Sequence, residues 1–157
     1  MRQFWLLASA LLLLACSESP GESLEAARQA LAESQYADAV AAADAGLGAD
    51  PDDLTRWGLE LARLEALARD GRGEDTLAQI EKLALERPEQ VPASQYFATS
   101  GQLRAAGEGP AAILVLDLGL KRFPEDATLL DLIEQAKAAP AAGSDELEML
   151  RSLGYVE

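Results

Sequence analysis

The side chain with the most distinctive chemistry is the thiol of Cys16, the only cysteine among 157 residues. A lone cysteine cannot form an intramolecular disulfide, so in an exported protein it indicates covalent modification or pairing with another chain. The chain contains no histidine, which excludes Ser-His-Asp and Cys-His catalysis and zinc sites built on imidazole. We therefore expect a protein that is not an enzyme, with no catalytic residue, no metal site and no cofactor.

The residues before Cys16 have the pattern of an export signal. Arg2 precedes an apolar run over residues 4–15, which is shorter than the roughly 20 residues that a membrane-spanning helix needs. The run ends in Leu13-Leu14-Ala15-Cys16, which resembles the lipobox of bacterial lipoproteins. This resemblance implies a signal peptide over residues 1–15, cleavage between Ala15 and Cys16, and a diacylglyceryl lipid on the sulfur. An ordinary signal peptide with an incidental cysteine is the alternative.

The lipoprotein resemblance also implies a location. In two-membrane bacteria an Asp after the lipidated cysteine favours the inner membrane, so Ser17 implies a lipid anchor in the outer membrane, facing the periplasm. Loss of Arg2 with the signal leaves 12 of the 13 basic residues against 27 acidic ones. A chain this acidic does not bind nucleic-acid phosphates or adhere by charge to an anionic membrane, so the lipid has to hold it there.

The rest of the chain is rich in Ala, Leu, Glu and Gln, with apolar residues at helical spacing and no strand-like alternation. These patterns predict an all-α protein. The predicted helices lie near residues 24–33, 37–48, 54–69, 74–86, 93–106, 110–122 and 126–138.

A sequence repeat of nearly constant length runs through these helices. Pro51, Pro88 and Pro124 lie 37 and 36 residues apart. Residues that lie the same distance before each proline occupy equivalent positions. Three such sets are Ser34, Gly71 and Gly107; Ala39, Thr76 and Ala112; and Gly46, Leu83 and Gly119. The pattern resembles the tetratricopeptide repeat, a pair of antiparallel helices of about 34 residues. The resemblance implies a short right-handed solenoid of about three helix pairs plus a capping helix over residues 22–138, after a tether over residues 16–21. A helical bundle without repeats is the alternative.

In the tetratricopeptide family the first helix of each pair lines a concave, partner-binding surface. The equivalent residues here are Leu24, Arg28, Leu61, Glu65, Phe97, Gly101 and Arg104. The chain has no Asn, so the family's Lys- and Asn-based carboxylate clamp is not expected. Arg28 and Arg104 could instead pair with a partner's carboxylate or with neighbouring Glu residues. Phe97 and Trp57 are expected in the core, because a helical domain with few aromatic residues usually buries them.

The C-terminal tail forms a separate element. A linker over residues 139–145 leads to a short amphipathic helix within residues 146–157, which Ser144 or Asp145 caps and Gly154 ends. Its apolar residues, through which it could dock, are Leu147, Leu150, Leu153 and Tyr155. The segment LRSLGYV resembles one near the end of sulfatase-type proteins, some of which carry tetratricopeptide repeats. The tail could fold back onto the last helices or dock in a groove of a partner.

These features predict a lipid-anchored scaffold or adaptor that binds an unidentified protein or peptide at the cell envelope. Two alternatives remain open at this level. The first is a periplasmic lipoprotein that binds a small molecule or glycan, and the second is an accessory subunit of an envelope hydrolase.

Overall fold

The computed structural model describes residues 19–138 and 143–157, and all regular structure in this part of the chain is helical. The helices are α1 (Pro20–Ala32), α2 (Tyr36–Gly48), α3 (Asp53–Arg69), α4 (Gly73–Glu86), a single 3-10 turn η1 (Pro88–Gln90), α5 (Ala93–Ala105), α6 (Gly109–Arg122), α7 (Ala127–Ala138) and α8 (Asp145–Ser152). The predicted all-α class is confirmed. Every predicted helix boundary in residues 24–138 lies within one residue of the observed one, except the start of α1.

Helix α1 begins earlier than predicted because Ser19 and Glu22 form a reciprocal N-terminal cap. The Ser19 backbone N–H donates to the Glu22 carboxylate at 2.8 Å, and the Glu22 N–H donates to the Ser19 hydroxyl at 3.3 Å. Pro20 suits the first helical position because it has no N–H to leave unpaired. The predicted tether over residues 16–21 therefore overlaps α1. The predicted signal peptide, Ala15 and Cys16 lie outside the described residues.

The turns at the three equivalent positions have the same backbone geometry. Ser34, Gly71 and Gly107 all adopt a left-handed conformation, with φ values of 60°, 72° and 90°. In each turn the residue that follows donates its N–H to a carbonyl five residues earlier. These hydrogen bonds run from Gln35 to Ala30 at 2.8 Å, from Arg72 to Leu67 at 3.0 Å and from Glu108 to Leu103 at 2.9 Å. The same chain reversal therefore joins α1 to α2, α3 to α4 and α5 to α6.

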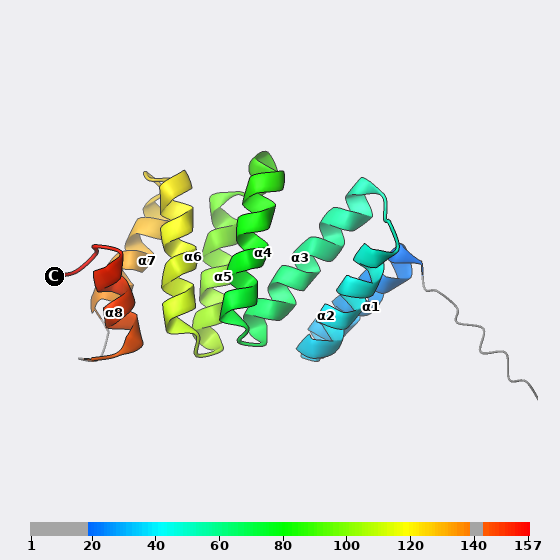
Figure 1. Ribbon diagram of the computed structural model, residues 1–157, viewed down its shortest axis with the longest axis horizontal. Coiled ribbons are helices and arrows are strands. Elements are labelled where there is room, and N and C mark those ends of the chain that lie inside the picture. The colour runs from blue at the N-terminus through cyan, green and yellow to red at the C-terminus, as the bar shows by residue number, and fades with distance from the viewer. Residues whose placement is uncertain (1–18, 139–142) are drawn as a thin grey trace, which may run out of the picture.

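The helices stand in a row from α1 to α8 (Figure 1). The helices α1, α3, α5 and α7 pack on one another in succession, while α2 packs on α1 and α3, and α6 packs on α5 and α7. Glycines permit the close approaches of α2 and α6. A Cβ on Gly46 would lie 2.8 Å from both Ser23 on α1 and Leu59 on α3. A Cβ on Gly119 would lie 2.9 Å from Tyr96 on α5 and 3.0 Å from Leu129 on α7.

Helix α4 departs from this arrangement, since it packs on α3 and α6 rather than closely on α5. At the position equivalent to Gly46 and Gly119 it carries Leu83, which is buried in the core. A leucine fills the space that the glycines leave open, so α4 cannot approach two neighbours as closely as α2 and α6 do.

The core has two parts that meet at α3. Leu59 and Leu67 of α3 belong to a cluster with the buried residues of α1 and α2, while Leu64 and Ala68 belong to a larger cluster with α4 to α7. Helix α3 is thus buried on two sides, which explains why its apolar residues do not form a single stripe.

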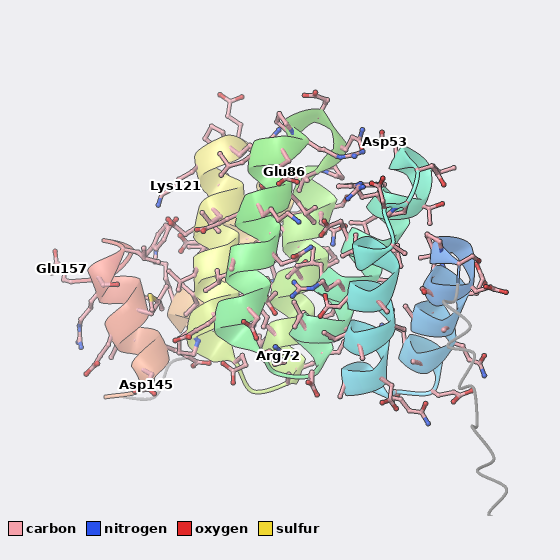
Figure 2. The ribbon with its side chains drawn as sticks, turned by 45° about the vertical axis from the view of Figure 1, so that its right-hand side comes forward. Asp53, Arg72, Glu86, Lys121, Asp145 and Glu157 are labelled. Carbon is pink, nitrogen blue, oxygen red and sulfur yellow. The ribbon has the colours of Figure 1, made fainter. Side chains whose placement is uncertain are left out.

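A buried polar network ties α4 to α3. Gln79 of α4 donates to the Glu60 carboxylate, which also pairs with Lys82 at 2.6 Å. Arg63 on α3 completes the network by bonding Gln79 at 2.7 Å and Asp44 of α2 at 2.6 Å. Figure 2 shows the many charged side chains over the surface of these helices. Since Glu60 and Gln79 are both buried, loss of either side chain would leave the other with one hydrogen-bonding partner fewer in the protein interior.

No helix in residues 19–138 and 143–157 is long and apolar enough to cross a membrane.

Candidate binding pocket

The structure separates the residues predicted for a partner-binding groove. Leu24 is buried in the core and packs over Gly58, where an added Cβ would lie 2.9 Å from the leucine. Leu24 therefore holds α1 against α3 and presents little surface to a partner. Arg28 is exposed and pairs with Glu25, one helical turn away, at 2.7 Å. A surface pair of this kind contributes little energy and leaves the arginine engaged.

The two predicted residues on α3 have different surroundings. Leu61 is half-buried against the larger core cluster, and Glu65 pairs with Arg69 at 2.8 Å. Trp57 is also half-buried against that cluster, with the Arg87 guanidinium 5.7 Å from the centre of its ring. Trp57 was expected in the core, and the structure places it at the edge of the core, where it is only partly buried.

Phe97 does not belong to the core, and the prediction that it is buried was wrong. Its side chain on α5 is 45% exposed. The neighbouring Tyr96 takes the buried position instead and packs edge-on against Phe123, with ring centres 6.1 Å apart. Adjacent residues of a helix point about 100° apart, so only one of these two aromatic rings can face the core.

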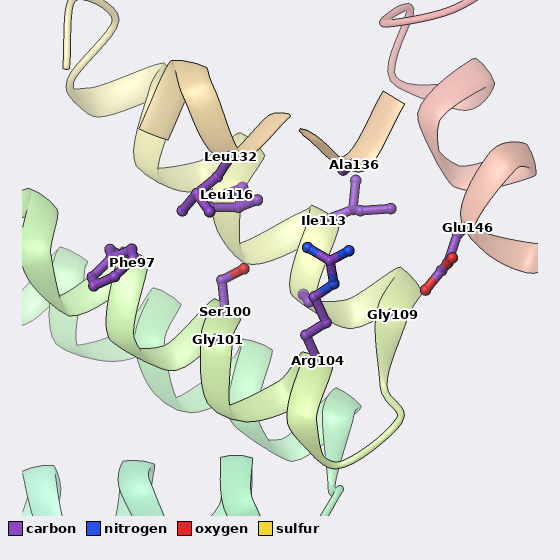
Figure 3. Close-up of a pocket in the computed structure, with 11 residues that line it drawn as sticks. Phe97, Ser100, Gly101, Arg104, Gly109, Ile113, Leu116, Leu132, Ala136 and Glu146 are labelled. Atoms are coloured by element: carbon purple, nitrogen blue, oxygen red, sulfur yellow. The ribbon is translucent and has the colours of Figure 1, made fainter. Parts of the chain in front are cut away.

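Phe97, Gly101 and Arg104 meet at a pocket of about 170 Å³ between α5, α6, α7 and α8. Its apolar wall comes from Ile113 and Leu116 of α6 and Leu132 of α7. In Figure 3 the Arg104 guanidinium and the Ser100 hydroxyl extend from α5 into the same space. The remaining lining residues are Gly109, Ala112, Ala136 and Glu146.

Arg104 differs from the other described basic residues in its lack of a polar partner. Among the arginines and lysines of residues 19–138 and 143–157, it alone makes no ion pair and no side-chain hydrogen bond. It stays unpaired although the whole chain has 27 acidic residues and only 13 basic ones. Ser100 is buried and its hydroxyl also has no partner in the described structure, although the hydroxyl oxygen is not fully enclosed. The pocket thus offers a cation and a hydroxyl beside an apolar wall.

The C-terminal tail completes the pocket. The Glu146 carboxylate of α8 lies against Gly109, at the N-terminus of α6, where an added Cβ would collide with it. The positive end of the α6 dipole favours a carboxylate at this point. Glu146 and Arg104 line the same pocket without forming an ion pair. No signal in the sequence indicated that residues 42 positions apart would line one pocket.

The docking residues of the tail lie on its own domain. Helix α8 packs on α6. Leu150 is fully buried, while Leu147, Leu153 and Tyr155 are partly buried. The Tyr155 hydroxyl donates to the carboxylate of Asp117, a buried residue of α6 that sequence reasoning did not select. The tail helix is capped by the Ser144 hydroxyl, as predicted for one of two candidates. The structure thus favours the fold-back alternative.

A wider groove of about 420 Å³ lies between α4 and α6, beside the 82%-exposed Leu85. Its two basic residues are already engaged. Lys121 pairs with Asp117 at 2.7 Å, and Arg122 donates to the carbonyl oxygens of Ala84, in the last turn of α4, and of Pro88, in η1. The basic side chains of this groove are thus engaged, so it offers an anionic ligand less than the Arg104 pocket does.

Within residues 19–138 and 143–157, no cluster of three or more carboxylate, histidine or cysteine side chains could hold a metal ion. The chain matches no family model, no curated protein and no solved structure.

Proposed function

We propose that this chain is a lipid-anchored adaptor of the bacterial cell envelope, whose helical domain binds a protein or peptide partner. In this proposal the domain is a short right-handed solenoid of tetratricopeptide type, with α7 as the closing helix, and the lipid on Cys16 holds it in the outer membrane facing the periplasm.

The observation that carries the proposal is the repeated turn at Ser34, Gly71 and Gly107. Three left-handed turns with the same hydrogen bond recur at intervals of 37 and 36 residues. The equivalent contacts of Gly46 and Gly119 support the same repeat unit. Stacked helix pairs of this kind expose an extended surface whose main use is to bind other proteins.

A lipid anchor would make such a binding surface more effective, because it confines the surface to one face of a membrane. Tethering to one membrane face raises the effective concentration of the adaptor toward anything else held there, without any new contact. This matters for a domain without histidine or a second cysteine, since position then becomes a large part of its contribution.

The partner surface that we propose is the face of α5 around Phe97. The exposed ring lies beside the pocket and is available to a partner without rearrangement of the core. Aromatic anchors commonly dominate the binding energy of protein interfaces. At this pocket a drug-sized small molecule or a glycan has less support, because such ligands usually occupy pockets of roughly 300–1,000 Å³ and this one measures about 170 Å³.

Crosslinking in the native cell, followed by purification of a tagged chain, tests the adaptor role. We expect the wild-type chain and the control Leu85→Ala to recover the same partner, and Phe97→Ala to lose it. Leu85 is the matched control because it is also apolar and exposed but lies on α4. Equal recovery with Phe97→Ala would move the interface elsewhere, and recovery of no protein above background would refute the adaptor role.

Cys16→Ala tests the anchor separately. We expect the variant to leave the membrane fraction while its circular dichroism stays helical, because residue 16 precedes the first described helix. Continued membrane fractionation of Cys16→Ala would contradict the lipid anchor.

A further inference from the structure

We infer that the pocket between α5, α6, α7 and α8 is a binding site for a single carboxylate carried on one compact apolar group, with Arg104 as its anionic anchor. This inference goes beyond the adaptor role, since it rests on the pocket alone and needs neither the lipid nor a protein partner.

The charge of the ligand follows from Arg104. An arginine without a partner is unexpected in a chain with a formal charge of −14, where the other described basic side chains are engaged. Its guanidinium can bind a carboxylate through two parallel hydrogen bonds. The Ser100 hydroxyl, which points into the same space (Figure 3), can donate a third hydrogen bond to the same carboxylate.

The apolar part of the ligand follows from the opposite wall. Ile113, Leu116 and Leu132 line the pocket together with Phe97. Contact with these side chains removes apolar surface from water at roughly 25 cal/mol per Å². A carboxylate without an apolar group would leave this wall in contact with water, so formate or acetate should bind weakly.

The size of the ligand follows from the volume. The pocket of about 170 Å³ is smaller than the roughly 300–1,000 Å³ of sites for drug-sized ligands, so it suits a compact ligand. A carboxylate and one branched alkyl group fill such a space. Two sources offer this chemistry, namely a free short-chain monocarboxylic acid and the last residue of a polypeptide, in which the carboxylate and the side chain share one carbon atom.

Glu146 restricts the charge of the ligand. Its carboxylate stands at the same pocket as Arg104 and repels a second negative charge. The site should therefore prefer monoanions to dianions such as glutarate or phosphate. Because Glu146 comes from α8, this preference depends on the docked tail.

Binding can be measured on the full chain by NMR titration and calorimetry, with 4-methylpentanoate as the small-molecule probe. We expect saturable binding with a Kd of about 1 mM or tighter, with shifts in the signals of Ser100, Arg104 and Ile113. The uncharged, nearly isosteric 4-methylpentan-1-ol should bind at least tenfold more weakly. Equal binding of the alcohol and the acid would overturn the role of Arg104.

A second arm distinguishes the two sources. A short peptide ending in leucine is compared with the same peptide ending in a carboxamide. Tighter binding of the free-acid peptide than of 4-methylpentanoate would assign the site to a chain terminus, and the reverse would assign it to a free acid. Absence of saturable shifts at the pocket with both probes would overturn the inference, whatever crosslinking shows about a protein partner.

Substitutions of single charged residues test whether Arg104 binds the carboxylate of the ligand. Arg104→Met keeps most of the length and packing of the side chain and should lower affinity for 4-methylpentanoate at least tenfold. Arg28→Met is the matched control, since Arg28 is also exposed but already pairs with Glu25, and it should leave affinity unchanged. Glu146→Gln should raise affinity and relax the preference against glutarate. Circular dichroism checks that each variant folds, and an unchanged affinity in folded Arg104→Met would refute the proposed anchor.

Discussion

Tyr155 donates a hydrogen bond from its hydroxyl to the Oδ1 atom of Asp117 at 3.0 Å, which joins the end of the chain to the middle of α6. Asp117 is buried and also pairs with Lys121 at 2.7 Å. Burial, together with the hydrogen bond to Asp117 and the negative charge of Asp117, raises the pKa of Tyr155 to about 12. This contact needs a protonated tyrosine, and so it gives the docking of the tail a pH dependence.

Alkaline pH should release the tail. A folded-state pKa above the ordinary value of about 10 means that the stabilisation from Tyr155 is complete below pH 10 and is lost as the pH rises through about 12. We expect the free energy of unfolding to fall in this range, with ionisation of Tyr155 visible in the ultraviolet absorbance of tyrosinate.

Tyr155→Phe isolates this effect from the other groups that titrate at alkaline pH. The variant should lose about 1 kcal/mol of stability at pH 8, because it removes one hydrogen bond while Asp117 keeps its pairing with Lys121. Its stability should fall less steeply than that of the wild type between pH 10 and 12. Parallel pH profiles for the two chains would contradict the role of Tyr155.

Gly46 and Gly48 offer a matched pair within α2. An alanine at Gly46 would press its methyl group to within 2.8 Å of Ser23 and Leu59, whereas a Cβ on Gly48 meets nothing within 4 Å. We expect Gly46→Ala to destabilise the protein by about 1–3 kcal/mol through overpacking. Gly48→Ala should be neutral or slightly stabilising, because alanine is the better helix former. Urea unfolding distinguishes the two, and similar stabilities would mean that α1, α2 and α3 are less closely packed than the structure shows.

The repeated turn predicts opposite effects at two equivalent positions. Ser34 holds a φ of 60°, a conformation that costs a non-glycine residue about 1–2 kcal/mol. Ser34→Gly should therefore raise stability, by less than this amount because glycine also has more freedom in the unfolded chain. Gly107→Ala should lower stability by about 1 kcal/mol, although a Cβ there meets nothing within 4 Å. Thermal unfolding of both variants checks the signs, and a destabilised Ser34→Gly would mean that the serine side chain has a role of its own.

Gln79→Ala should show how far the buried network fixes α4. Removal of the amide leaves the buried Glu60 carboxylate with Lys82 as its remaining partner, so we expect a loss of about 1–3 kcal/mol. Gln135→Ala is the control, because Gln135 bonds Asp131 at the surface, and it should change stability by about 0.5 kcal/mol at most. A double-mutant cycle with Glu60→Gln would give a coupling near zero if the two side chains acted independently.

The sequence by itself determined the helices of this protein, because their ends depend on local chemistry. Asp52 caps α3 by accepting hydrogen bonds from the N–H groups of Leu54 and Thr55, at 3.0 and 3.1 Å. Gly71 and Gly107 end α3 and α5 because glycine adopts a positive φ without strain. The spacing of apolar residues indicated the other helices, and it also predicted the tail helix and the apolar position of Leu150, which is buried.

Only the tertiary structure decided which helices meet and which side chains they leave exposed. Helical periodicity could not show that α4 packs on α6 rather than closely on α5, or that Tyr96 rather than Phe97 would face the core. Nor could it place Glu146 beside Arg104, since their elements meet only after α8 packs on α6. Caps and turns depend on neighbours within one turn of chain, whereas a pocket depends on the volumes of side chains from several helices.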